Sequence, residues 1–328
     1  MLTRSDNFSE KEYSRAFSEI IRQVQKVIIN KDSAVIKTLM AILAGGHILI
    51  EDVPGVGKTS LALAFSRAME LDYKRLQFTT DVLPGDVTGF SVFNKQTGKF
   101  EYKKGAAICN LFLADEINRA SSKTQSALLE IMEEGSVTVD GVTYKLPQPY
   151  IVIATQNPVG SVGTQLLPES QLDRFMIKIS MGYPDKKSEI NILKGRQTEN
   201  PLDSVQKVAQ AQDILKLQKI VAETYISNPV YEYIVELVSQ TRTEPMIKLG
   251  LSPRGSIAVM KMAKACAFAK GRNFVIPDDV ISVFPDVAAH RILLNPKAKA
   301  TGVTDRKIIA DIIRRVPVPE PRSTGRHL

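Results

Sequence analysis

Residues 52–59, which read DVPGVGKT, combine the residue types that bind a phosphate group. Gly55 and Gly57 allow a tight turn whose backbone N–H groups point at phosphate oxygens, and the helix expected after them adds the positive end of its dipole. Lys58 would reach the β- and γ-phosphates of a nucleotide, and the Thr59 hydroxyl would ligate the Mg²⁺ that bridges them. The apolar strand expected before this segment favours a phosphate-binding loop over a polar turn with an incidental lysine. One position departs from the usual pattern GxxxxGK[ST], because Asp52 stands where the first glycine is expected.

Two adjacent carboxylates follow the next apolar run. Residues 111–116 read LFLADE, which predicts a buried parallel strand that delivers Asp115 and Glu116 to its C-terminal edge. Asp115 would hold Mg²⁺ through water, together with Thr59, and Glu116 would orient and deprotonate an attacking water. An ordinary strand end with solvated acids is the alternative. The residues expected to contact nucleotide are Pro54, Gly55, Val56, Gly57, Lys58, Thr59, Ser60 and Asp115.

A third apolar run, residues 150–155, predicts another strand, and Asn157 follows it. An amide is donor and acceptor at once, so Asn157 could hydrogen-bond both the γ-phosphate and the attacking water. The alternative is a turn asparagine before Pro158.

Two arginines could stabilise the charge that develops on the γ-phosphate. Arg174 lies between a polar helix and a β-rich segment, and an arginine supplied by a neighbouring subunit can perform this role. A local ion pair with Asp173 or Glu169 is the alternative. Arg254 follows Ser252 and Pro253, which suit the N-cap and the first position of a helix, so it would project from a fixed helix start. The alternative, an exposed first-turn arginine, is unfavourable at the positive end of a helix dipole.

Taken in order, EDVPGVGKTSLA, LFLADEINRA, KTQSALLEIMEEG, VIATQNP, LPESQLDRF and LSPRG resemble the MoxR family of AAA+ ATPases over roughly residues 27–319. The resemblance implies a magnesium-dependent ATPase that forms a ring, usually hexameric, and acts as a chaperone-like remodeller in the bacterial cytoplasm. Many members of the family work with proteins that carry a von Willebrand factor A domain. The cofactors implied are ATP and Mg²⁺.

The resemblance also assigns roles to single residues. It gives Lys58 and Thr59 the Walker A roles, Asp115 and Glu116 the Walker B roles, Asn157 the sensor 1 role, Arg174 the arginine finger and Arg254 the sensor 2 role. Arg119 either faces the neighbouring subunit or pairs with Glu116 or Glu169. Two departures limit the transfer: Asn30 replaces a family glycine, and residues 161–167 lack a Tyr-Pro pair. Asparagine tolerates positive φ, so the turn at residue 30 can survive.

The order of apolar patterns predicts an α/β fold, with a parallel P-loop sheet flanked by helices over residues 1–183. Residues 90–102 and 137–146 alternate apolar and polar side chains around turn residues, which predicts two β-hairpin insertions. In related ATPases such hairpins engage the client, and surface hairpins without a ligand are the alternative. Residues 184–328 predict an all-helical lid domain, hinged near Pro184, that ends in a basic tail.

Composition bounds the possible functions. The chain has 328 residues and a net charge of +8, and residues 296–328 carry eight Lys or Arg against three Asp or Glu. We expect this tail to be solvated or partner-facing, and no aromatic-studded basic groove indicates nucleic acid. The chain has no run apolar enough for a membrane span and no signal-peptide pattern, so we expect a cytoplasmic location. Two cysteines and three histidines without metal-like spacing make a zinc site improbable.

Three other functions remain open at this point. An ATPase that remodels nucleic acid would use the same hairpins and the basic tail. The chain also resembles the ATPase subunit of magnesium chelatase, from the same clade. A nucleotide-gated scaffold without turnover is the non-enzymatic alternative.

Overall fold

The computed structural model describes residues 10–157, 167–195 and 200–320, and it divides into two compact units, residues 1–221 and 222–328. This division lies later than the boundary at residues 183/184 that the helical pattern suggested. The cause is a set of hydrogen bonds that tie the intervening segment to the first unit. The N–H groups of Val208 and Ala209 donate to the Ala68 carbonyl at 2.9 and 3.1 Å, and Gln218 Nε2 donates to the Ile42 carbonyl at 2.8 Å.

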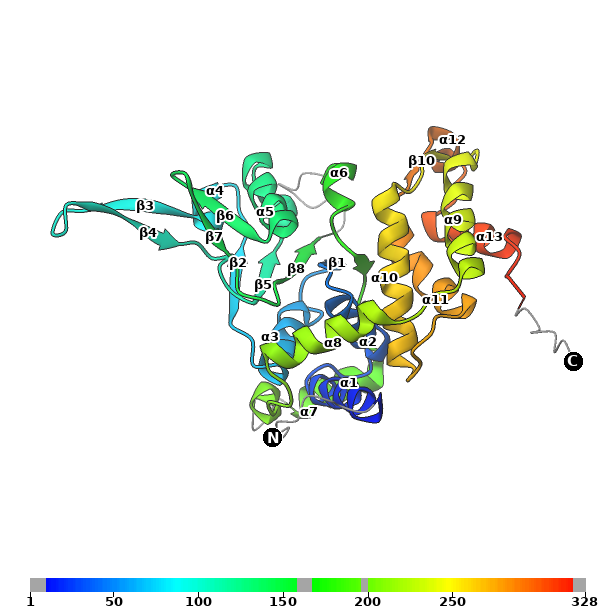
Figure 1. The fold of residues 1–328 in the computed structure, drawn as a ribbon, viewed down its shortest axis with the longest axis horizontal. Coiled ribbons are helices and arrows are strands. Elements are labelled where there is room, and N and C mark those ends of the chain that lie inside the picture. Colours follow the sequence, from blue (N-terminus) through cyan, green and yellow to red (C-terminus); the bar gives the residue numbers. More distant parts are fainter. Residues whose placement is uncertain (1–9, 158–166, 196–199, 321–328) are drawn as a thin grey trace, which may run out of the picture. The chain divides into compact units, whose positions relative to one another are not determined.

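The first unit is built on a five-stranded parallel sheet with the order β2-β5-β8-β1-β9 (Figure 1). Its strands are β1 (Ile48–Glu51), β2 (Tyr73–Gln77), β5 (Leu111–Asp115), β8 (Ile151–Gln156) and β9 (Ile177–Ile179). All five residues of β5 are buried, as a central strand covered on both faces requires. The predicted α/β P-loop fold is therefore confirmed.

Helices surround this sheet. They are α1 (Glu10–Gln25), α2 (Asp32–Leu43), α3 (Lys58–Ala68), α4 (Pro84–Thr88), α5 (Ser122–Glu134), α6 (Glu169–Leu172), α7 (Lys186–Gly195) and α8 (Ala211–Glu223), with 3-10 turns η1 (Ile117–Arg119) and η2 (Pro201–Ser204). Helix α1 packs against α2 and α3. Its buried side chains, Phe17, Ile20, Ile21 and Val24, recur at helical spacing on one side, as the sequence pattern predicted.

Both predicted hairpins are present. The first consists of β3 (Gly89–Asn94) and β4 (Lys99–Lys104), and the second of β6 (Ser136–Val139) and β7 (Val142–Lys145). Figure 1 shows the β3–β4 hairpin projecting away from the sheet, after the five-residue helix α4. The rings of Tyr102 and Tyr144 stack with centroids 4.1 Å apart and so join the two hairpins. Gly89 lies at the base of the β3–β4 hairpin with φ +92°, and a Cβ on it would lie 2.4 Å from the Lys103 carbonyl oxygen.

The second unit is mostly helical. It contains α9 (Asn228–Thr243), α10 (Pro253–Ala269), α11 (Pro277–Ala288), α12 (Pro296–Ala300) and α13 (Asp305–Arg315). It is not entirely helical as expected, because β10 (Ile247–Leu249) and β11 (Leu293–Leu294) form a short antiparallel pair. The fully buried Asp279 carboxylate joins α11 to the end of α10, since Lys270 and Arg272 lie 3.0 and 2.6 Å from its Oδ1.

Both cysteines are buried and unpaired with each other. Cys266 lies within α10, and Cys109 lies in the bend before β5. Burial raises the pKa of the Cys109 thiol to about 12, which keeps it protonated. In the described ranges, no helix combines the length and the apolar composition that crossing a bilayer requires.

His47 forms a pH-sensitive link at the start of β1. Its Nδ1 accepts a hydrogen bond from the Val152 N–H, and its Nε2 lies 3.1 Å from the Met132 carbonyl oxygen, which requires a proton on Nε2. The ring is therefore neutral, and its burial lowers the pKa from 6.5 to about 4.

The lowered pKa predicts a loss of stability in mild acid. Below pH 6.5 the histidine of the unfolded chain becomes protonated, whereas His47 of the folded chain stays neutral down to about pH 4. The free energy of unfolding therefore falls as the pH decreases between these two values. Between about pH 7 and pH 5 the loss from this residue is on the order of 2 kcal/mol. Urea unfolding of the wild type and of His47→Gln, which keeps one donor and one acceptor but does not titrate, measures it. Equal losses in the two proteins would contradict the prediction.

Candidate functional site

The phosphate-binding loop has the conformation that its glycines predict. Gly55 and Gly57 have φ values of +87° and +97°, and Gly57 is the N-cap of α3, which begins at Lys58. A Cβ on Gly55 would meet no atom within 4 Å, so the backbone conformation rather than space requires glycine there. Lys58 Nζ donates to the Asp52 carbonyl at 2.7 Å. Burial lowers the pKa of Lys58, and the surrounding carboxylates, chiefly Asp115, oppose that shift.

Asp52 replaces the usual glycine because its carboxylate fastens the start of the loop. Its Oδ2 accepts hydrogen bonds from Met181 N at 2.6 Å, Gly182 N at 2.7 Å and Ser180 Oγ at 3.0 Å. Oδ1 accepts from Val53 N at 3.0 Å. The side chain is buried, and Asp52 is not among the residues with positive φ, so this position does not need glycine. The loop is thereby tied to the segment that follows β9.

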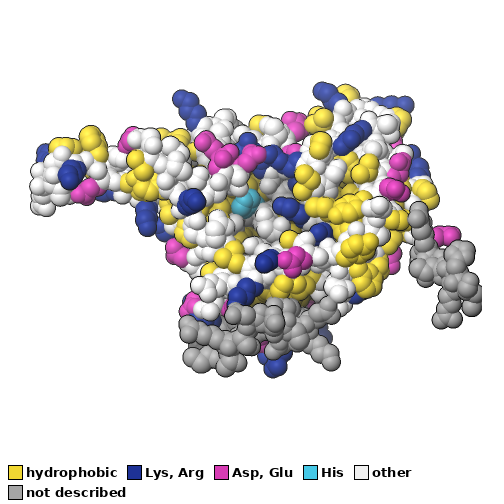
Figure 2. Space-filling model, viewed as in Figure 1, with side chains coloured by type: hydrophobic (Ala, Val, Ile, Leu, Met, Phe, Trp, Pro, Cys, Tyr) yellow, Lys and Arg dark blue, Asp and Glu magenta, His cyan; other side chains and the backbone are white. Residues whose placement is uncertain are grey.

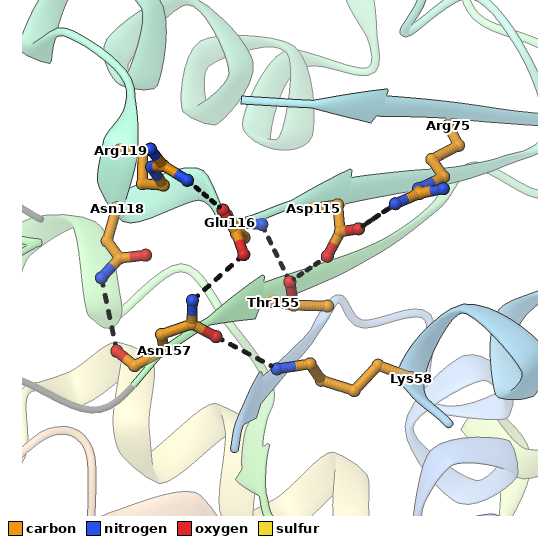
Figure 3. A network of polar contacts seen from close by, with 8 residues as sticks. All are labelled: Lys58, Arg75, Asp115, Glu116, Asn118, Arg119, Thr155 and Asn157. Carbon is orange, nitrogen blue, oxygen red and sulfur yellow. Dashed lines mark hydrogen bonds and ion pairs between the residues drawn. The ribbon is translucent and has the colours of Figure 1, made fainter. Parts of the chain in front are cut away.

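The two predicted acids lie where β5 ends. Asp115 is the last residue of that strand, and Glu116 directly after it has φ +56°, a left-handed conformation that is costly for glutamate. Asn157 Nδ2 donates to Glu116 Oε1 at 3.1 Å, and Asn157 Oδ1 accepts from Lys58 Nζ at 3.5 Å (Figure 3). One amide therefore joins the lysine to the glutamate, as a residue that serves both the phosphate and the water would.

Thr155 and Arg75 also belong to this network, and the sequence did not single them out. The Thr155 hydroxyl donates to Asp115 Oδ1 at 2.6 Å and accepts from Glu116 N at 2.9 Å. Arg75 on β2 donates to Asp115 Oδ2 from Nη2 at 2.7 Å and from Nε at 3.2 Å (Figure 3). The signal for Thr155 was a hydroxyl at the end of an apolar strand. Arg75 carries no such signal without the strand order.

A cavity lies beside the loop. It has a volume of about 380 Å³, and its lining includes Val27, Ile29, Gly57, Met181, Ile192 and Leu202. Asn30, in the turn that leads past this cavity, has φ +54°, so the turn survives without the glycine as expected. The apolar lining and the adjacent loop suit the base of a nucleotide whose phosphates lie on the loop.

The arginines occupy separate places. Arg174 Nη2 lies 3.2 Å from Glu133 Oε2 on α5, a local partner that the sequence did not indicate. Arg119 Nη1 lies 3.0 Å from Glu116 Oε2, one of the two pairings considered for it. Arg254 is exposed in the first turn of α10 in the second unit, where Ser252 Oγ accepts from Gly255 N and is the predicted N-cap. The loop at residues 161–167 falls outside the described ranges except for Leu167.

Comparisons with known proteins agree with this site. A model of the ATPase family associated with various cellular activities (AAA) matches residues 47–177, and a model of the AAA lid domain matches residues 239–312. YeaC of Bacillus subtilis is 47% identical over 93% of this chain and 96% of its own length. The chaperone MoxR1 of Mycobacterium tuberculosis is 36% identical over 92% of this chain and 81% of its own.

A solved structure shows the same fold. The crystal structure of a protein from Cytophaga hutchinsonii superposes with a TM-score of 0.88 at 40% identity, covering 95% of this chain and 97% of that one. The sequence match to MoxR1, the two family models and the P-loop site agree. The chain therefore belongs to the MoxR family of AAA+ ATPases.

Proposed function

We propose that this ATPase hydrolyses Mg-ATP at sites shared between neighbouring subunits of a ring, and uses the cycle to remodel protein clients. The observation that carries the proposal is the convergence of Lys58, Asp115, Glu116 and Asn157 at one edge of the sheet. Ligands of open α/β sheets bind at the carboxyl ends of the strands, where these side chains lie.

Residues 54–60 and the neighbouring cavity bind the nucleotide. The backbone N–H groups of the loop and the start of α3 hold the phosphates, and Lys58 neutralises the β- and γ-oxygens. The cavity takes the adenine. Asp52 keeps the loop against residues 180–182, whose Met181 also lines the cavity, so phosphate and base sites have a fixed spacing.

Hydrolysis falls to Glu116 and Asn157. Glu116 takes the proton of the attacking water, and the Asn157 amide holds the Glu116 carboxylate in place and senses the γ-phosphate. The Thr59 hydroxyl and the Asp115 carboxylate are hard oxygen donors, so they fit Mg²⁺. When bound, Mg²⁺ would neutralise charge on the bridged phosphates.

The three arginines complete the active site between subunits. Arg174 acts as the finger on the γ-phosphate of the next subunit, Arg254 senses the nucleotide from the lid, and Arg119 lies near the catalytic glutamate. The AAA+ family forms oligomers of this kind, and we propose a hexamer in the cytoplasm.

The β3–β4 hairpin is the proposed contact with clients. Phe90, Phe93 and Phe100 are 49%, 50% and 73% exposed, and Figure 2 shows hydrophobic and basic side chains on this hairpin. Its lysines are Lys95, Lys99, Lys103 and Lys104. A surface of this kind suits apolar, acidic segments of a protein, and proteins with a von Willebrand factor A domain are candidate partners. The same pairing of aromatic rings with lysines favours single-stranded nucleic acid as a second candidate.

Phosphate release from ATP tests the proposal. We expect hydrolysis that EDTA abolishes and that rises per subunit with protein concentration, because each site needs two subunits. An acidic model protein that unfolds on heating should stimulate ATP hydrolysis. In turn, this ATPase should slow the aggregation of the model protein. Phe93→Ser with Phe100→Ser should keep basal hydrolysis and lose the stimulation, while Val235→Ser, at an exposed apolar position of α9 outside both hairpins, serves as control. Stimulation by single-stranded DNA but not by protein would support the second candidate instead.

A further inference from the structure

Arg75 makes an ion pair that crosses from the edge strand β2 to the metal-binding position of the site. Its Nη2 and Nε lie 2.7 and 3.2 Å from a single oxygen, Asp115 Oδ2. In the β2–β5 register the residue beside Asp115 is Gln77, so Arg75 reaches it from two positions earlier on the strand. The Arg75 side chain is 43% exposed and that of Asp115 is 10% exposed.

The other Asp115 oxygen is held from the opposite side. Thr155 Oγ1 donates to Oδ1 at 2.6 Å, and this hydroxyl in turn accepts the Glu116 N–H at 2.9 Å. Thr155 is fully buried, so its hydroxyl is committed to this link. The Asp115 carboxylate is thus oriented by one neutral, enclosed donor and by one cationic, solvent-accessible donor.

The nearby acids are held differently. Asp52 is held by N–H and hydroxyl donors, and Glu116 is held by Asn157 and by Arg119, which lies three residues away on the same turn. Arg75 reaches its acid from a different strand and carries a positive charge to the carboxylate proposed for Mg²⁺. Two cations would then share one carboxylate, and each weakens the attraction of that carboxylate for the other.

We propose that Arg75 is a positioning residue that holds Asp115 and sets how much Mg²⁺ the protein needs to bind nucleotide. The inference rests on the proposed Mg-ATP site. Removal of the guanidinium leaves Asp115 oriented by Thr155 but with its full charge, so Mg-ATP binds at a lower free Mg²⁺ concentration. Binding of ATP without metal does not involve Arg75 and stays unchanged.

Equilibrium binding of a fluorescent ATP analogue over a series of free Mg²⁺ concentrations, and in EDTA, tests this inference. We expect Arg75→Gln to lower the half-saturating Mg²⁺ concentration about fivefold, the scale of one partly exposed ion pair, and to leave affinity in EDTA within about twofold. Arg75→Lys keeps the charge but offers one nitrogen where Arg75 uses two, so the half-saturating Mg²⁺ concentration should shift less. Lys74→Gln removes a positive charge from the adjacent position of β2 and should leave the half-saturating Mg²⁺ concentration unchanged. Thermal melting checks that each variant is folded.

The possible outcomes distinguish a failure of the Arg75 inference from a failure of the proposed Mg-ATP site. An unchanged or higher Mg²⁺ requirement in Arg75→Gln, when the wild type responds to Mg²⁺, overturns the inference and leaves the proposed function standing. Binding of the variant in EDTA that is weaker by more than about twofold overturns it as well, because Arg75 would then act on the nucleotide directly and not through Asp115. Wild-type binding that ignores Mg²⁺ refutes the proposed Mg-ATP site itself, and the inference with it. If Arg75→Gln does not fold, the shift of Arg75→Lys decides.

Discussion

Replacement of Glu116 by glutamine is expected to reduce the rate of ATP hydrolysis about a thousandfold, the scale of a lost general base. Glutamine has the size of glutamate and still accepts the hydrogen bond that Asn157 Nδ2 donates at 3.1 Å, but it cannot take a proton from water. ATP binding depends on residues 54–60 and should stay within about threefold of the wild type. Single-turnover phosphate release and equilibrium nucleotide binding measure the two quantities separately.

Glu130→Gln is the matched control for this variant. Glu130 is exposed on α5, so the same chemical change there should leave hydrolysis as it is. Undiminished hydrolysis by Glu116→Gln would reject Glu116 as the base. Loss of binding together with turnover would instead show that the charge of Glu116, which pairs with Arg119 Nη1 at 3.0 Å, is needed to hold the site together.

Local chemistry explains which parts of the site could be predicted from sequence. A glycine at positive φ, a serine at a helix start and a strand that ends in two acids each leave a mark within a few residues, and Gly57, Ser252 and Asp115 were found this way. The hairpins were found because alternation around a turn is equally local.

Contacts between strands leave no such mark. Arg75 and Thr155 meet at Asp115 only because β2 and β8 flank β5, and that order is a property of the folded sheet. The division at Val221 was missed for the same reason, since a helical pattern does not say which unit the helix packs against. Asp52 was recognised as a departure, but its four hydrogen bonds depend on where residues 180–182 lie.

Arg174 is the residue that we expect to act on the nucleotide of a neighbouring subunit. In its own chain it pairs with Glu133 at 3.2 Å, yet its buried Nε has no hydrogen-bond partner among the described residues. An arginine that is only partly satisfied by its own chain can rearrange toward a phosphate at low cost. If Arg174 is the finger of the neighbouring site, Arg174→Ala should retain nucleotide binding and lose about a thousandfold in turnover, the lower end of the range for such arginines. Glu133→Gln removes only the local pair and should keep most of the activity.

Mixing two inactive variants separates a finger in trans from a local structural role. Arg174→Ala subunits supply an intact Glu116, and Glu116→Gln subunits supply an intact Arg174, so an interface between them can carry one complete site. In randomly mixed rings at equal amounts, about a quarter of the interfaces join the two kinds in the productive order, and we expect recovery of about a quarter of wild-type turnover. Phosphate release from the mixture, compared with each variant alone at the same total concentration, measures this recovery. A mixture as inactive as its components, although it assembles as the wild type does, would mean that Arg174 and Glu116 act on the same subunit's nucleotide or that Arg174 only supports α5.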